Sequence, residues 1–178
     1  MERSVNWFIN QGLLLKTPFI RRLAPRLQDK ARSNLITMNI LFDLYSNEEA
    51  RTTLNIPDEY DPGEWVVISG YYAMYMMSLA ALSKIGFRSK NHAATAVALE
   101  TFFVKKKLLE PEILRMLENA RLEREQIEQL KLAKQRREIA QYSVTKETTR
   151  KIAENIRKDA FKFVERLEAL IESLPSTP

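Results

Sequence analysis

The chain contains no cysteine and a single histidine, His92. The absence of cysteine excludes a disulfide framework, thiol catalysis and any zinc or iron–sulfur site with cysteine ligands. One histidine excludes a histidine-rich metal centre, and a Ser-His-Asp arrangement would have to use His92. We therefore expect neither a metal ion nor a cofactor.

Glycine and proline are also scarce, with 4 and 7 residues in a chain of 178. So few turn residues argue against a many-stranded sandwich or barrel, and no glycine-rich phosphate-binding loop is present. Apolar residues make up 45% and charged residues 29%, which is typical of a soluble globular protein. The length predicts a single domain over residues 1–178, with residues 1–20 as an N-terminal extension packed on it.

Apolar residues recur at spacings of three and four along most of the chain, which predicts helices. Asp61 before Pro62, Asn91 or Ser89, and Thr145 are the expected N-caps of three of them. No alternating run is long enough to predict a sheet. The fold class expected is all-α, an antiparallel up-and-down four-helix bundle with an extra short helix. The expected helices cover residues 22–51, 62–84, about 90–105, 111–140 and 145–174.

Residues 65–82 form a run of 18 residues without a charge, long enough to be a transmembrane candidate. The run contains three Tyr, two Ser and a Gly, and it stands among amphipathic segments. A helix that is apolar all round is also what the centre of a bundle requires. We expect a buried core helix, no membrane contact and a cytoplasmic location, because the N-terminus does not resemble a secretory signal.

The net charge is +5, from 28 Lys and Arg against 23 Asp and Glu, and the cations gather in two stretches. Residues 16–32 and residues 84–107 each carry six cations and one acid. If the two stretches share one face, they form a surface that attracts phosphate. If they lie apart, they are two ordinary solvated surfaces, and the sequence leaves both alternatives open.

Two groups of residues are candidates for chemistry. His92 stands at the start of a predicted helix, after Arg88 and Lys90. These cations and the helix N-terminus both favour its neutral form, in which it could contact phosphate or act as a general acid or base. Arg137 and Tyr142 are five residues apart and could together contact a phosphodiester. The structural alternatives are a capping or packing histidine, an arginine at a helix end and a packed tyrosine.

Four segments in this order, with their intervening helices, are similar to an uncharacterised branch of the HEPN superfamily of prokaryotic helical domains. The resemblance covers most of the chain and implies a four-helix bundle that is often a homodimer. It further implies a minimal nucleotidyltransferase as partner, in a toxin–antitoxin or stress system. The segments that carry it are NQGLLLKTP (10–18), GYYAMYMMSLAAL (70–82), GFRSKNH (86–92) and REIAQYS (137–143).

Active members of this superfamily resemble metal-independent ribonucleases, with an Arg and a His four to six residues apart at the dimer interface. Here Arg137 matches the Arg, and Tyr142 follows after four residues where a His would be needed. The Asp that this branch often carries before the Tyr is Gln141. A tyrosine with a pKa near 10 is poorly matched to proton transfer at neutral pH.

The interpretation we favour is a non-catalytic HEPN-like module that binds a nucleotide, RNA or a partner protein through a basic surface around Arg88, Lys90, His92 and Arg137. One alternative is a degenerate metal-independent ribonuclease that uses Arg137 and Tyr142. A second alternative is a purely structural, oligomeric helical protein without affinity for nucleotides.

Overall fold

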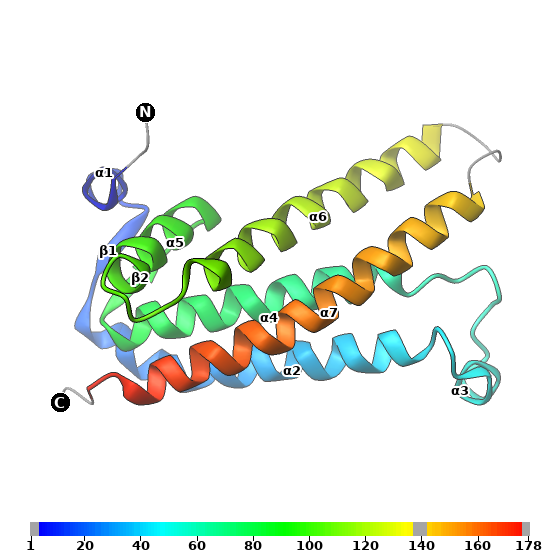
Figure 1. Cartoon of the computed structure of the whole chain (residues 1–178), viewed down its shortest axis with the longest axis horizontal. Helices are drawn as coiled ribbons and strands as arrows, with labels where there is room; N and C mark the ends of the chain where they lie inside the picture. Colours follow the sequence, from blue (N-terminus) through cyan, green and yellow to red (C-terminus); the bar gives the residue numbers. More distant parts are fainter. Residues whose placement is uncertain (1–3, 137–141, 176–178) are drawn as a thin grey trace.

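A computed structural model describes residues 4–136 and 142–175, and within them the side chains of residues 4–129 and 149–175. The described part of the chain is helical apart from one small sheet, so the predicted all-α class is confirmed (Figure 1). The elements are α1 Val5–Asn10, β1 Leu14–Lys16, η1 Pro18–Leu23, α2 Ala24–Asp43, α3 Glu48–Thr53, α4 Gly63–Lys84, β2 Phe87–Ser89, α5 His92–Leu99, η2 Glu100–Val104, α6 Pro111–Arg136 and α7 Tyr142–Ser173.

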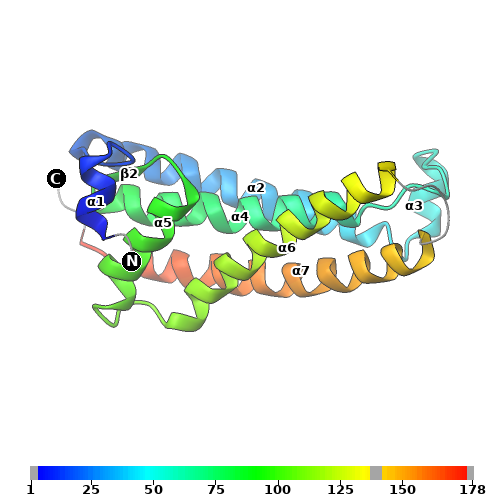
Figure 2. The same cartoon turned by 90° about the horizontal axis from the view of Figure 1, so that it is seen from above.

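Helix α4 forms the centre of the protein and contacts α2, α6 and α7 (Figures 1 and 2). It is apolar on all sides, and it is the one helix in the described ranges that is long and apolar enough to cross a membrane. Yet 78% of its most apolar window is buried inside the protein. Burial of this kind is what the central helix of a packed core requires.

The single helix predicted over residues 22–51 is divided in the structure. Helix α2 ends at Asp43, and the side chain of Asn47 accepts a hydrogen bond of 2.9 Å from the backbone N–H of Ala50 to start α3. An asparagine at this position competes with helix continuation, because its side chain satisfies an N–H that a longer helix would pair with a backbone carbonyl. The prediction of one continuous helix is wrong for this reason.

The start of α4 lies one residue after the predicted one. Pro62 is the N-cap residue, while Asp61 Oδ1 accepts hydrogen bonds from the Gly63 N–H and from the Tyr45 hydroxyl, both at 2.9 Å. Asp61 therefore does bind the first turn, as its position predicted, from one residue further out. Burial and the neighbouring Asp61 carboxylate raise the pKa of Tyr45, so its hydroxyl remains a donor.

The observed starts of the last two long helices, α6 and α7, can be compared with the predicted ones. Helix α6 begins at Pro111, as predicted. Helix α7 is already helical from Tyr142, so Thr145 lies inside it and the prediction that Thr145 caps it is wrong. The predicted interruption at 141–145 is contradicted from Tyr142 onward, and residues 137–141 lie outside the described residues.

A two-stranded antiparallel sheet corrects the prediction of no sheet, since its strand β2 occupies what was expected to be a linker. In this sheet Leu15 pairs with Arg88, and Leu14 pairs with Ser89. Strands of three residues are too short to show an alternating pattern in the sequence. Leu14 and Phe8 belong to the buried core, which ties the N-terminal segment to the helices.

Candidate nucleic-acid interface and its neighbouring cavity

The small sheet joins the two basic stretches of the sequence. Lys16 lies at the end of β1, where it pairs with Phe87, and Arg88 is the middle residue of β2. The connection extends beyond the strands, because the backbone N–H of Lys90 donates to the Leu13 carbonyl at 2.9 Å. The sheet also contacts η1, whose last turn carries Arg21 and Arg22.

Two long stretches of the sequence contain no carboxylate, and parts of both lie at this end of the protein. Residues 4–28 and 65–99 contain no Asp or Glu, and they build α1, β1, η1, nearly all of α4, β2 and α5. Cations that have no anions nearby raise the positive electrostatic potential around them. We call the following cations of β1, η1 and the β2 region the basic end: Lys16, Arg21, Arg22, Arg88 and Lys90.

The ion pairs in the described residues are formed by cations outside the basic end. Each of these pairs joins an Arg or Lys to a Glu or Asp within 4 Å, so the charge of the cation is compensated. At the basic end, Arg21 lies against Gly86, and its Nε is buried without a hydrogen-bond partner in the described region. The paired cations are Arg32, Lys105, Arg115, Arg121, Arg124, Arg150 and Arg166.

His92 is turned towards α4 at the first position of α5. Asn91 caps this helix, with its side chain accepting from the Ala94 N–H at 2.8 Å. The His92 Nδ1 shares a hydrogen bond with the Tyr71 hydroxyl, and the ring centroids of His92 and Tyr75 are 4.3 Å apart. Packing against two tyrosines fixes the orientation of the imidazole.

The His92 ring lines a cavity of about 440 Å³ between α4, α5 and α6. Arg88 and Lys90, predicted to bind phosphate together with His92, are not among its lining residues. The structure thus separates the three candidates into a basic end and an adjoining cavity. The cavity is lined by Tyr71, Tyr75, His92, Ala93, Ala96, Val97, Leu117, Glu118, Arg121 and Leu122.

Two arginines of α6 lie near His92, and the sequence reasoning missed both. Arg121 lines the cavity and forms an ion pair of 2.8 Å with Glu125. The guanidinium carbon of Arg124 lies 4.9 Å from the centre of the Tyr71 ring, a cation–π contact. Their spacing of three residues places both on one side of α6. Nothing in the sequence shows that this side faces α5.

These surroundings set the charge of the cavity. Burial lowers the pKa of His92 from its ordinary 6.5, and the positive charges of Arg124 and Arg121 lower it further, while Glu125 opposes them. Burial raises the pKa of both Tyr71 and Tyr75. At neutral pH the imidazole is therefore neutral and the tyrosine hydroxyls are protonated. From the sequence, the neutral form of His92 was attributed to Arg88, Lys90 and the helix N-terminus. In the structure its pKa is lowered by burial and by Arg124 and Arg121 of α6.

The second pair of candidates is Arg137 and Tyr142, which lie at or next to the residues that the structure leaves undescribed. Arg137 lies outside the described residues. Tyr142 is the first residue of α7, and its side chain lies outside the described side chains. In the described residues no group of three or more His, Asp or Glu side chains could hold a metal ion.

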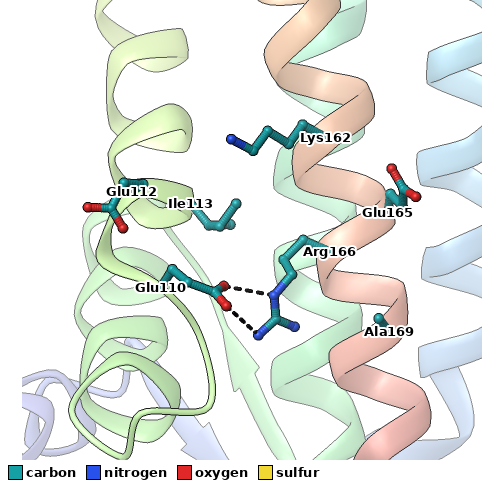
Figure 3. Close-up of a pocket in the computed structure, with 7 residues that line it drawn as sticks. All are labelled: Glu110, Glu112, Ile113, Lys162, Glu165, Arg166 and Ala169. Atoms are coloured by element: carbon teal, nitrogen blue, oxygen red, sulfur yellow. Dashed lines mark hydrogen bonds and ion pairs between the residues drawn. The ribbon is translucent and has the colours of Figure 1, made fainter.

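A second cavity, of about 490 Å³, lies between the start of α6 and the C-terminal half of α7 (Figure 3). Its arginine, Arg166, binds both carboxylate oxygens of Glu110, at 2.7 and 3.0 Å, and the Leu108 carbonyl at 2.9 Å. These contacts lower the pKa of Glu110. The pairing of Arg166 with Glu110 links α7 to the segment before α6, and Lys162 is a further cation in the lining of this cavity.

Comparison with known proteins finds no family model, no curated protein and no solved structure that matches this chain.

Proposed function

We propose that this chain is a HEPN-like, non-catalytic module that binds single-stranded RNA through its basic end. The observation that carries the proposal is the joining, by a sheet, of two parts of the sequence that hold the cations of the basic end and contain no carboxylate, residues 4–28 and 65–99. Phosphate groups gain most from cations that have no competing anion nearby. Cations on three adjoining elements suit a chain of phosphates better than one isolated phosphate.

An exposed aromatic ring among these cations favours RNA over an acidic protein partner. Phe19 lies in η1 between Lys16 and Arg21, and 76% of its surface is exposed. Aromatic rings beside cations are the usual platform for single-stranded nucleic acids, because every base can stack on them. An acidic peptide would use the cations without needing the exposed ring.

The arrangement of the long helices supports the HEPN-like part of the proposal. Helices α2, α4, α6 and α7 run in alternating directions in Figure 1, and α4 contacts the other three. We propose that they form an antiparallel up-and-down four-helix bundle. As the resemblance implies, a second copy of this chain and a minimal nucleotidyltransferase are the proposed protein partners, in the cytoplasm.

The test of RNA binding is a titration of labelled single-stranded RNA with charge-neutralised variants. The double variant Arg88→Gln/Lys90→Gln should weaken binding at least tenfold, since each cation contacts phosphate. Phe19→Ala should weaken it by removing base stacking. The matched control is Lys151→Gln/Lys158→Gln, two exposed lysines of α7. Equal losses in the test and control double variants would contradict the proposal.

The neutral His92, hydrogen-bonded to Tyr71, favours one second candidate, a degenerate metal-independent ribonuclease. A neutral imidazole can accept a proton from a ribose hydroxyl. This candidate predicts RNA cleavage that persists in EDTA and is lost in both His92→Gln and Arg137→Ala. Absence of cleavage by the unmodified chain would leave the binding module alone.

A further inference from the structure

Three large apolar side chains are exposed together on the outer face of α2 and α7, at the edge of the helical assembly (Figure 1). Ile36 and Ile40 are one turn of α2 apart, and 62% and 59% of their surfaces are exposed. Phe161 of α7 is 43% exposed and lies beside the same part of α2, because the Arg157 guanidinium contacts both the Phe161 ring and the Phe42 ring. We call Ile36, Ile40 and Phe161 the apolar patch. Grouped exposure of large apolar side chains marks an interaction site.

Polar contacts between α2 and α7 hold the apolar patch in a fixed arrangement. One turn before Ile36, the Arg32 Nε donates to the Glu168 carboxylate at 2.7 Å. Within the patch, Arg157 donates to Asn39 Oδ1 through Nε and Nη2, at 2.9 and 2.7 Å. Because these contacts already order the two helices, the patch loses little conformational freedom when a partner covers it.

Helix α2 and the start of α3 carry opposite exposed charges at their two ends. Arg26 and Lys30 lie in the N-terminal half of α2, while Asp43 ends α2 and Glu48 begins α3. These four residues form none of the ion pairs found in the described residues, whereas the carboxylate of Asp29 is already paired. Unpaired opposite charges on one surface suit a partner with the reverse order of charges.

A second copy of this chain has that order of charges when its α2 approaches antiparallel. In an interface with two-fold symmetry, a residue on one side of the axis meets the residue equally far on the other side. Lys30 and Asp43 are centred on residues 36–37 of the chain. Arg26 and Glu48 are centred on the same point. One axis through the apolar patch therefore matches both pairs of charges.

We propose that α2 and the adjoining part of α7 form a two-fold interface with a second copy of this chain, in which the two α2 helices are antiparallel and the apolar patches meet. The inference rests on the proposed function, which names a second copy as partner, and assigns that copy a face. The resemblance implies a different interface, at Arg137 and Tyr142. Phe161 is 19 residues from Tyr142 along α7, or about 28 Å. The basic end precedes α2, so the dimer carries its two basic ends on opposite sides of the interface, each open to RNA.

The experiment measures the dissociation constant of the dimer of the full chain by sedimentation equilibrium. Ile36→Glu should raise this constant at least about a hundredfold, because an unpaired charge is buried in both copies. The matched control is Leu54→Glu at the end of α3, whose leucine is 63% exposed and lies outside the patch. A monomeric unmodified chain would overturn the inference. A dimer that survives Ile36→Glu would overturn it too, because another face would then form the dimer.

A charge reversal tests the antiparallel register. Lys30→Glu alone and Asp43→Lys alone should each weaken the dimer by about threefold to tenfold, because like charges then meet across the interface. The double variant Lys30→Glu/Asp43→Lys should recover the affinity of the unmodified chain. Within one copy these residues are thirteen positions apart on α2, about 20 Å, so the recovery cannot arise from a contact inside one copy. Absence of recovery would overturn the proposed register.

The same variants separate this inference from the function on which it rests. Ile36→Glu should leave the affinity of one basic end for a short single-stranded RNA unchanged, since Ile36 lies outside the basic end. RNA binding by a chain that stays monomeric would overturn the interface alone. A dimer that is lost in Ile36→Glu, in a chain that does not bind RNA, would overturn the RNA module alone.

Discussion

Gly70 occupies the crossing of three helices, and no other residue type fits its place in α4. A methyl group on its Cα would lie inside van der Waals distance of the Ile156 side chain on α7 and 2.9 Å from the sulfur of Met38 on α2. The close approach of α4 to both helices therefore depends on the absence of a side chain here.

The variant Gly70→Ala should lower the free energy of unfolding. Alanine is the better helix former by about 1 kcal/mol, but overpacking costs about 1–3 kcal/mol and dominates at a crossing this tight. Urea titration measures the loss. In a double-mutant cycle with Ile156→Ala, the two changes should cost less together than their sum. Additive losses would show that the crossing is not the cause.

His92 gives the stability of the protein a defined pH dependence. Its pKa is lowered in the folded state, so the unfolded chain binds a proton at a higher pH than the folded chain does. Stability contributed by the neutral form is complete above about pH 6.5 and is lost as the pH falls towards the folded pKa. We expect His92→Gln to flatten the fall in unfolding free energy between pH 7.5 and pH 5.5.

The direct check is the NMR titration of the single imidazole, which needs no assignment because the chain has one histidine. Its midpoint should lie below 6.5 in the unmodified protein and move upward in Arg121→Gln, which removes one of the two cations that lower it. A midpoint at or above 6.5, unmoved by Arg121→Gln, would contradict the described environment.

Single residues were predictable where the cause is local. The sequence predicted the helix start at Pro111 and, as one of two candidates, the Asn91 cap, because caps act within one turn. It also predicted a neutral His92, for an incomplete reason. Arg121 and Arg124 were not predicted as neighbours of His92, since about thirty residues separate them and their proximity depends on how α6 docks on α5.

At the scale of elements, the β1–β2 sheet is a short structure with a large effect on the surface. It pairs Lys16 of the N-terminal segment with Phe87, and Leu15 with Arg88, of a segment about seventy residues later. Leu14 is fully buried in the core and thereby attaches β1 to the helices. The Leu14 side chain therefore contributes to holding the basic end together.

Leu14→Ala should lower the free energy of unfolding by about 2–5 kcal/mol, the usual cost of deleting a fully buried leucine. It should also weaken RNA binding, because loosening β1 separates the cations. Hydrogen exchange at the Lys90 amide, which donates to Leu13, reports on the sheet directly. The control Lys16→Ala should leave stability and this exchange rate unchanged. Leu14→Ala with unchanged exchange would refute the anchoring role.

The contact between Arg166 of α7 and Glu110 before α6 serves structure rather than binding (Figure 3). Both side chains are partly exposed, so solvent weakens the pair, and Glu110→Gln should cost less than about 1 kcal/mol. The same variant should leave RNA binding unaffected, as measured by titration. A loss of ligand affinity would identify this second cavity as a binding site after all.

Elements were predictable in proportion to their length. Helix α4, with 22 residues, followed from its long apolar run and the Asp61–Pro62 signal before it, and the start of α6 followed from Pro111. Strands of three residues carry no periodic signal, and the break between α2 and α3 at Asn47 depends on one side chain. The start of α7 was placed at Thr145 because a threonine resembles a cap, although the helix begins by Tyr142.

The whole molecule separates its charges by position. Two stretches of sequence without a carboxylate, residues 4–28 and 65–99, adjoin at one end through the sheet, while the described ion pairs lie on other elements. From the sequence, the cations were counted in residues 16–32 and 84–107, and whether these two stretches share a face stayed open, because a strand pairing across seventy residues cannot be read from either stretch. The joined surface underlies the proposed RNA binding.

The measurement that tests this account most directly is the salt dependence of the affinity for single-stranded RNA. The logarithm of the binding constant should fall linearly with the logarithm of salt concentration between about 50 and about 200 mM. For single strands each phosphate contact contributes about 0.7 to the slope, so Arg88→Gln/Lys90→Gln should reduce its magnitude by about 1.4. Lys151→Gln/Lys158→Gln should leave the slope unchanged. Affinity that is independent of salt, or a slope that is the same in both double variants, would contradict the account.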